Sequence, residues 1–327
     1  MKAFKYYNAQ DLKDAVAVLA REEDSRILAG GTDMLGEMKN RYVTPERLVN
    51  LKTVKGLDGI SFGTQGLAIG ALTRLNDIAS NATVKNKYPG LAEAADSVGS
   101  PQLRNMGTLG GNLCQRPRCW YYRGREYNCV RKGGGTCFAV SGRNKYHCIL
   151  NGGPCFMVHP SDVAPMLMAL GASVTVAGPG GTRELKLDDF FVLPETDPMV
   201  ETVLKKGEVL TRVTVPAPPA GQKSHYLKFK ERESRDFALV GAAVVLEMTG
   251  NLVKRASLVL SGVSPAPYRA VESEKMLTGR ELTGELLEQA AEAAVKDAAP
   301  LEENEYKVQL SKTIFKRAVL RAAGVEV

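Results

Sequence analysis

The apolar positions of the chain follow a helical spacing in some stretches and a strand-like spacing in others. Residues 10–20 carry apolar side chains at three- and four-residue intervals, as a helix with one buried face does. The same reasoning predicts helices at 74–80, 89–98, 159–172, 284–298 and 305–323, and strands at 47–51, 66–71, 174–178, 208–216, 237–248 and 256–263, besides a short strand from Arg26 that runs into a Gly-Gly turn. This mixture indicates the α+β class.

Turn-forming and linker residues divide the chain. Residues 217–222 separate two stretches of different composition and predict a domain boundary, and 249–251 predict the turn of a hairpin. A chain of 327 residues is long enough for two or three domains. We find no stretch with the apolar length of a membrane span or a secretory signal. This favours a protein without a membrane span and in the cytoplasm, and leaves open co-export to the periplasm with a partner.

Positive charge is concentrated in one part of the chain. Lys and Arg total 43 against 36 Asp and Glu, a net charge of +7. Residues 114–155, called here the cysteine segment, contain one acid, Glu126, and carry the whole excess. A basic chain can bind nucleic acid, but charge confined to one loop argues against that function. The basic residues of the segment are Arg116, Arg118, Arg123, Arg125, Arg131, Lys132, Arg143 and Lys145.

All six cysteines lie in the same segment. Disulfide frameworks belong mainly to small secreted domains, which this chain does not resemble. Structural zinc sites usually use close CxxC pairs, and none is present, although zinc stays open. Four thiolates around a [4Fe–4S] cluster are compatible with wide spacing, and a cationic segment lowers the electrostatic cost of an anionic cluster. The clustering therefore favours iron–sulfur over zinc, over disulfides, and over incidental cysteines in a solvated loop.

Two glycine-rich turns give a second chemical signal. Residues 29–33 read Ala-Gly-Gly-Thr-Asp, and residues 107–112 read Gly-Thr-Leu-Gly-Gly-Asn. The backbone N–H groups of such turns can approach a phosphate closely. Neither turn is a GxGxxG fingerprint or a P-loop, so a Rossmann site and a Walker ATPase are not supported. Each turn alone is more often a plain tight turn, whereas the two together suit the pyrophosphate of a flavin or nicotinamide dinucleotide.

Residues 29–40, 100–113 and 159–172, in this order, resemble the FAD-binding medium subunit of the xanthine dehydrogenase / molybdenum hydroxylase family. With 229–244, the resemblance spans nearly the whole chain. The cysteine segment stands as an insertion between the second and third motifs. It resembles the subset with an extra [4Fe–4S] cluster, which includes the β-subunit of 4-hydroxybenzoyl-CoA reductase and the FAD subunit of certain bacterial aldehyde oxidoreductases.

The resemblance implies a fold and a domain division. The fold would be the two-subdomain FAD-binding fold of the vanillyl-alcohol-oxidase (PCMH) type, followed by a C-terminal α+β flavoprotein domain. The subdomains would span 1–55 and 56–216, the second with its cluster insertion at 114–155, and the C-terminal domain 223–327.

The resemblance also implies the FAD contacts. Backbone N–H groups of Leu28, Ala29, Gly30, Gly31, Thr32, Asp33 and Met34 would line the pyrophosphate. The second wall would be formed by Thr108, Gly111 and Asn112. Asp162 would contact the ribityl chain or the flavin. Lys230 would lie near the flavin ring, where a cation stabilises the reduced, anionic flavin; without the resemblance, Lys230 is interpreted as a solvated strand residue.

For the cluster, the resemblance selects Cys119, Cys129, Cys137 and Cys155 as ligands. Cys148 is the rival for the fourth position. Cys114 is expected to be a buried non-ligand and His147 a structural residue. The aromatic residues after the first ligand, which are expected to shield the cluster from water, are Trp120, Tyr121 and Tyr122.

We find no catalytic group in the sequence, which has three His and no HExxH motif. The resemblance implies an electron-transfer subunit with FAD and [4Fe–4S]. Its partners would be a small [2Fe–2S] subunit and a large molybdopterin subunit, in a dimer of heterotrimers, with an external carrier such as ferredoxin or NAD. The complex would be 4-hydroxybenzoyl-CoA reductase-like; an aldehyde oxidoreductase-like or xanthine dehydrogenase-like complex is the alternative. A zinc-stabilised basic binding module and a stand-alone FAD oxidoreductase are the competing classes.

Overall fold

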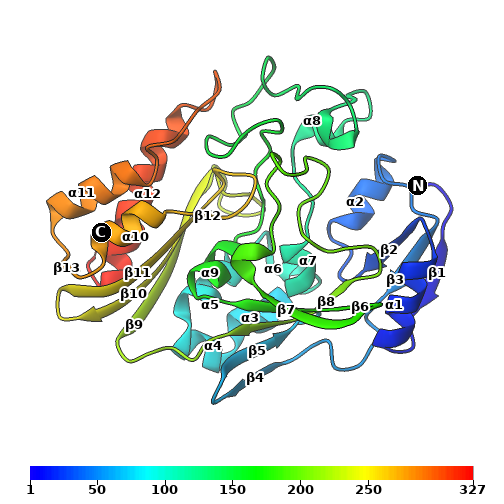
Figure 1. The fold of residues 1–327 in the computed structure, drawn as a ribbon, viewed down its shortest axis with the longest axis horizontal. Coiled ribbons are helices and arrows are strands. Elements are labelled where there is room, and N and C mark those ends of the chain that lie inside the picture. Colours follow the sequence, from blue (N-terminus) through cyan, green and yellow to red (C-terminus); the bar gives the residue numbers. More distant parts are fainter. Residues whose placement is uncertain (327) are drawn as a thin grey trace.

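Three sheets, built one after another along the chain, carry the structure. The computed structural model describes residues 1–326. Figure 1 shows the first sheet at one side of the molecule, the second in the middle and the third at the other side. The mixed helix-and-sheet class expected from the sequence is confirmed.

The first sheet is parallel, with strand order β1-β3-β2. Helix α1 begins where the side chain of Asp11 accepts a hydrogen bond of 2.8 Å from the backbone N of Asp14, a typical N-cap. Strand β2 runs directly into the glycine turn 29–33, as predicted. The elements are β1 (Lys5–Asn8), α1 (Leu12–Arg21), β2 (Ser25–Leu28), α2 (Met34–Lys39) and β3 (Arg47–Asn50).

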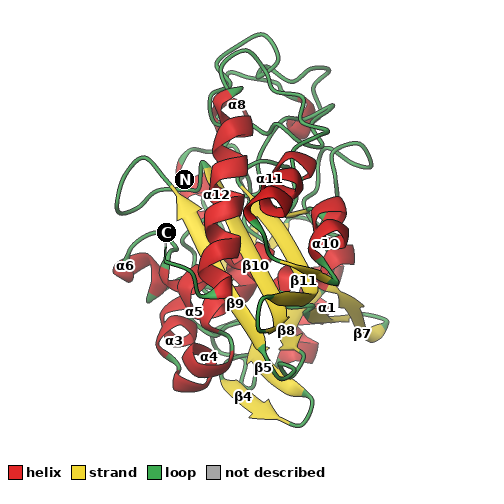
Figure 2. Ribbon diagram, turned by 90° about the vertical axis from the view of Figure 1, so that its left-hand side faces the viewer, coloured by secondary structure: helices red, strands yellow, loops and turns green. Residues whose placement is uncertain are grey.

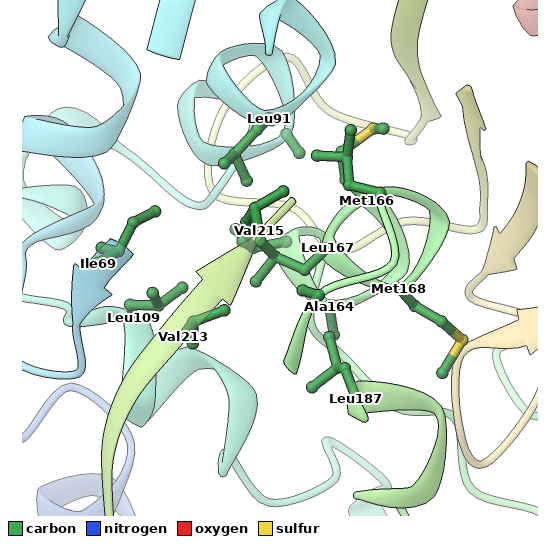
Figure 3. Packing of buried hydrophobic residues seen from close by; sticks show 14 of the residues in the cluster. Ile69, Leu91, Leu109, Ala164, Met166, Leu167, Met168, Leu187, Val213 and Val215 are labelled. Atoms are coloured by element: carbon green, nitrogen blue, oxygen red, sulfur yellow. The ribbon is translucent and has the colours of Figure 1, made fainter. Parts of the chain in front are cut away.

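The second sheet is antiparallel, with strand order β4-β5-β8-β6-β7. Helix α9 (Val163–Ala169) is buried over its whole length and packs with α5 (Pro89–Asp96) above this sheet. Figure 3 shows Leu167 of this helix pointing toward Val215 and Leu91. The strands are β4 (Ile60–Gly63), β5 (Gly66–Gly70), β6 (Ser173–Gly178), β7 (Gly181–Lys186) and β8 (Val209–Val215).

The third sheet is also antiparallel, with strand order β12-β11-β10-β9 and β13 paired to β11. Its long hairpin turns at Gly250, as predicted. Helix α12 lies along β9 and β10 (Figure 2). The elements are β9 (Gln222–Phe229), β10 (Val240–Thr249), β11 (Leu252–Ser261), β12 (Tyr268–Arg269), α10 (Val271–Leu277), β13 (Arg280–Glu281), α11 (Gly284–Ala293) and α12 (Tyr306–Ala323).

The sequence patterns do not predict the strands β1, β4, β7 and β9, nor most of the short helices. The region 97–113, interpreted from sequence as aperiodic, contains two helices of four and five residues, which are too short to show a period. The helix predicted at 159–172 begins only at Val163, because the Ser161 hydroxyl accepts a bond of 2.9 Å from the backbone N of Ala164. The remaining helices are α3 (Leu75–Ser80), α4 (Ala82–Lys87), α6 (Pro101–Arg104), α7 (Leu109–Leu113), α8 (Trp120–Arg123), η1 (Val130–Lys132) and η2 (Leu187–Asp189).

The cysteine segment forms a largely irregular layer at one end of the molecule, around α8 and η1 (Figures 1 and 2). Near its end, Ile149 and Leu150 are buried in the core beneath the third sheet. The described residues outside this segment, 1–113 and 156–326, are called the scaffold below. Within residues 1–326, we find no helix with both the length and the apolar character needed to span a bilayer.

Candidate cofactor sites

Four of the six cysteines face one pocket. Tyr121, Tyr122 and Phe138 supply aromatic walls, and the Arg131 side chain closes one side. The cysteines are those selected from the sequence, and they come from four separate turns of the segment. The pocket is lined by Cys119, Tyr121, Tyr122, Cys129, Val130, Arg131, Cys137, Phe138, Cys155 and Met157.

Backbone N–H groups point at the sulfurs. Cys119 accepts hydrogen bonds from the backbone of Tyr122 and Tyr121, although burial outweighs them and raises the pKa of its thiol to about 11. The Cys137 sulfur receives hydrogen bonds from Cys155 and from the backbone of Phe156, which lower the pKa of its thiol. Donors aimed at sulfur stabilise thiolates, the form in which cysteine binds metal.

The two other cysteines lie outside this pocket. Cys148 is fully buried, and a Cβ added at Gly152 would stand 3.0 Å from its sulfur, so this thiol packs against the 148–156 turn. Burial raises the pKa of the Cys148 thiol to about 12. Cys114 packs against the core of the second sheet, and burial raises the pKa of its thiol to about 12. Both environments favour the neutral thiol.

The donors of the pocket suit iron–sulfur chemistry. Among residues 1–326, no group of three or more His, Cys, Asp or Glu side chains is arranged to hold a metal ion. A four-iron cluster makes a different demand, because each of four thiolates binds its own iron around a cage. The pocket offers four thiols and no carboxylate, and soft thiolate donors select such metals. The residues present therefore fit a cluster of this type.

Aromatic rings separate the pocket from solvent on one side. Tyr121 and Tyr122 are buried, as the shielding role expected for them requires. Tyr121 stacks edge-on with Tyr127 at 5.0 Å between ring centroids. Trp120 differs, because it is 38% exposed and covers His147, whose Nε2 lies 3.2 Å from the sulfur of Cys119. His147 thus contacts one of the pocket thiols, which the sequence did not indicate.

The positive charge of the cysteine segment is mostly paired with acids from elsewhere in the chain. The guanidinium of Arg131 is buried and lies 2.5 Å from a carboxylate oxygen of Glu201. The sequence interpretation, in which the cations compensate an anionic cluster, is therefore revised: these cations chiefly attach the segment to the scaffold. The pairs are Arg118 and Arg123 with Asp33, Arg116 and Arg131 with Glu201, Arg143 with Glu303, and Lys145 with Glu231.

The two glycine turns meet. A Cβ added to Gly30 would stand 2.0 Å from the carbonyl oxygen of Met106, so only glycine permits this approach. Gly31 has φ +73°, which a side chain would also disfavour. At the second turn, the Thr108 hydroxyl accepts a bond of 3.2 Å from the backbone N of Gly111. The two turns are therefore adjacent, as the two walls of one phosphate site would be, and Gly30, Gly31 and Gly111 leave their backbone partly or fully open to a dinucleotide.

Asp162 lies in a buried network at the junction with the third sheet. Its carboxylate accepts hydrogen bonds from the Tyr226 hydroxyl at 2.8 Å and from Lys228 Nζ at 2.7 Å. Lys228 Nζ also donates to the carbonyl oxygen of Ser97, at 3.1 Å. The sequence interpretation singled out Lys230 instead, whose Nζ donates to the carbonyl oxygen of Glu233. Strand alternation could have identified Lys228, because it shares a face of β9 with the buried Tyr226.

The comparisons with known proteins identify the class. Residues 2–218 match the family described as the FAD binding domain in molybdopterin dehydrogenase. Residues 224–322 match the CO dehydrogenase flavoprotein C-terminal domain. The chain is therefore an FAD-binding flavoprotein, with an FAD-binding domain followed by a C-terminal flavoprotein domain.

Two curated relatives and one solved structure narrow the class. The chain is 34% identical over 320 residues to the aldehyde oxidoreductase FAD-binding subunit PaoB of Escherichia coli K12, covering 95% of this chain and 96% of the relative. It is 30% identical to the carbon monoxide dehydrogenase medium chain of Afipia carboxidovorans, covering 98% and 96%. It superposes with TM-score 0.80 and 29% identity on a structure of carbon monoxide dehydrogenase from Hydrogenophaga pseudoflava that lacks the Mo-pyranopterin moiety of the molybdenum cofactor, covering 98% of this chain and 97% of that chain.

The chain belongs to the molybdenum hydroxylase/CO dehydrogenase family, as an FAD-binding medium subunit of an oxidoreductase. The family resemblance drawn from the three sequence motifs is thereby confirmed.

Proposed function

We propose that this chain is the electron-transfer subunit of a heterotrimeric molybdenum hydroxylase, and that it holds a [4Fe–4S] cluster as well as FAD. Its partners are a small [2Fe–2S] subunit and a large molybdopterin subunit, as a dimer of heterotrimers. An external carrier, ferredoxin, NAD or another, exchanges electrons with it. The name "medium chain" of the Afipia relative supports a multi-chain assembly. The observation that carries the cluster is the single pocket lined by four thiols.

In this proposal another chain of the complex binds the substrate. The relatives of this chain therefore indicate the substrate only through the complexes to which they belong. Identity of 34% with an aldehyde oxidoreductase subunit supports an aldehyde-oxidising complex. The inserted cysteine segment supports a 4-hydroxybenzoyl-CoA reductase-like complex as the second candidate. Activity of the purified complex toward aromatic aldehydes and toward 4-hydroxybenzoyl-CoA separates the two.

The proposed cluster ligands are Cys119, Cys129, Cys137 and Cys155. Cys155 is favoured over Cys148 because its sulfur faces the pocket and is in hydrogen-bond contact with Cys137. Cys148 is buried and does not line the pocket.

The proposed FAD contacts are the backbone of Leu28 to Met34, the turn with Thr108, Gly111 and Asn112, and Asp162. The close approach of the two turns supports the first two sets. Asp162 has both carboxylate oxygens engaged by Tyr226 and Lys228, which supports a role in fixing the wall beside the flavin. Lys230 remains a proposed contact near the flavin ring. It lies directly after β9, in an exposed turn.

In this proposal the residues of the chain bind the two cofactors, orient them and keep water away from them. FAD exchanges one or two electrons and an iron–sulfur cluster exchanges one, so together they connect carriers of both kinds. The N–H groups aimed at Cys119 and Cys137 stabilise ligating thiolates. Buried Tyr121 and Tyr122 exclude water from the pocket. Lys228 holds the Asp162 carboxylate in place.

Iron and sulfide analysis tests the cluster. In anaerobically purified full-length protein with its co-purifying chains, we expect four irons per chain beyond those of the partner subunits, and Cys155→Ala should lose them but still bind FAD when FAD is supplied in excess. Cys114→Ala is the matched control and should keep both. Loss of iron in Cys148→Ala and not in Cys155→Ala would move the fourth ligand to Cys148. A colourless protein that contains zinc would instead support the binding-module class.

We propose the domain division at 1–55, 56–216 and 223–327, which the three successive sheets support. The cytoplasmic location stays a prediction, which fractionation of cells expressing the whole complex would test.

A further inference from the structure

The carboxylate of Asp33 connects the first glycine turn to the cysteine segment. Asp33 Oδ1 accepts a hydrogen bond from Arg123 Nη2 at 2.7 Å and another from Arg118 Nη1. Its Oδ2 accepts one of 2.8 Å from the backbone N of Arg116. Burial alone would raise the pKa of this carboxyl, but Arg118 and Arg123 outweigh it and lower the pKa, so the group stays ionised. Three donors from one short stretch therefore converge on one side chain of the glycine turn.

Internal hydrogen bonds hold the stretch 116–123 in shape. Arg123 Nε donates to the carbonyl oxygen of Pro117 at 2.7 Å, and its Nη2 lies 3.4 Å from that of Arg116. Arg118 directly precedes Cys119, the first cysteine of the thiol pocket. The turn that presents Cys119 and the turn that presents Gly30 and Gly31 thus share one set of hydrogen bonds.

A second link runs parallel to the first. Glu37 of α2, four residues beyond Asp33, is 1% exposed. It accepts a hydrogen bond of 3.2 Å from the hydroxyl of Tyr122, whose ring lines the thiol pocket. The glycine turn and the helix that follows it therefore both rest on residues of the pocket wall.

We infer that Asp33 is a positioning residue through which occupancy of the thiol pocket and binding of FAD reinforce each other. This inference rests on the proposed cluster. Ligation of Cys119 would fix the 116–123 stretch, and through Asp33 it would hold the N–H groups of the glycine turn in the arrangement that receives a diphosphate. A turn already ordered by one cofactor loses less entropy when it binds the other, and such coupling is reciprocal.

A double-mutant cycle on FAD affinity tests the coupling. The full chain is prepared as wild type, Asp33→Asn, Cys155→Ala and the double variant, and the FAD dissociation constant is measured by recovery of flavin fluorescence. We expect each single change to weaken FAD binding at least about 5-fold. The double variant should be no weaker than the single ones, because both changes break the same connection.

Glu303→Gln is the matched control. Glu303 also lies outside the cysteine segment and accepts a backbone N–H from it, at Asn144 (2.8 Å), as well as pairing with Arg143. It does not touch the glycine turn, so FAD affinity should stay at the wild-type value.

The outcomes separate the inference from the proposed function. If wild type holds the four irons and iron-free Cys155→Ala binds FAD as tightly, the cluster stands and the coupling is overturned. Strictly additive effects in the cycle also overturn the coupling, because they reduce Asp33 to a local structural role. If wild type contains no cluster iron, the proposed cluster fails and the coupling fails with it. Should Asp33→Asn not fold, the comparison of wild type with Cys155→Ala still decides.

Discussion

The scaffold and the cysteine segment are held by different forces. In the scaffold, α9 buries seven consecutive residues, which belong to a large cluster of buried apolar side chains. The cysteine segment has only α8 and η1 as helices, and it is attached to acids far away in sequence through the buried Arg131 and the half-buried Arg123. Apolar burial is non-directional and tolerates small shifts, whereas an ion pair between buried groups needs its geometry. The scaffold should therefore fold without cofactors, and the segment should depend on its ion pairs and ligated thiols.

The largest effect is expected in the scaffold. Leu167 is fully buried in α9, so Leu167→Ala removes apolar contacts and leaves a cavity. We expect the free energy of unfolding to fall by about 3 to 5 kcal/mol, measured by urea denaturation of the FAD-bound chain. Iron content of the folded protein should stay unchanged, because the cavity lies outside the thiol pocket. Iron loss in this variant would contradict the separation of the two regions.

A smaller and local effect is expected at the base of the cysteine segment. Glu201→Gln removes the charge that both Arg131 and Arg116 approach, and leaves the Arg131 guanidinium buried. The cost is about 3 kcal/mol, confined to residues 114–155 and the loop around 201. Hydrogen exchange should accelerate there and not in β10 or α9, and iron should dissociate faster.

Glu231→Gln is the control for this change. It removes the exposed pair with Lys145, and exposed pairs contribute little, so neither exchange nor iron retention should change. Equal acceleration in the two variants would show that the burial of Arg131 is irrelevant to how the segment is held.

The smallest effect concerns acid sensitivity. His159 is buried against Phe191, and burial lowers the pKa of its imidazole to about 4, below its ordinary value of 6.5. Between these values the unfolded chain binds the proton and the folded chain does not, so stability falls as the pH drops from 6.5 toward 4. At pH 5 the loss is about 2 kcal/mol.

Comparison with His159→Gln isolates this contribution in denaturation curves recorded from pH 7 to pH 5. The variant should lose less stability than wild type across this range. Identical pH profiles would contradict this prediction, because they would mean that the pKa of His159 is the same in the folded and the unfolded chain.

Much of the scaffold could be predicted from the sequence. The helix predicted at 305–323 agrees with α12 to within a residue at each end, because its buried residues follow a helical period. The strand predicted at 66–71 agrees with β5 equally well, as a short and mostly buried apolar run that begins and ends at glycine. The same reasoning missed α7, whose five residues are set by the Thr108 cap. Strand alternation could have identified Lys228 as facing inward, but not its partner, because Asp162 comes from the other side of the linker.

The amino-acid sequence by itself determined the class of the fold, the two glycine turns and the set of thiols, because these depend on local period and on residue type. Only the tertiary structure decided which thiols share a pocket and which acids the arginines meet. Asp33 and Glu201 lie far along the chain from their partners, and the pairing of groups distant in sequence follows from how the sheets and loops pack, which no local pattern encodes.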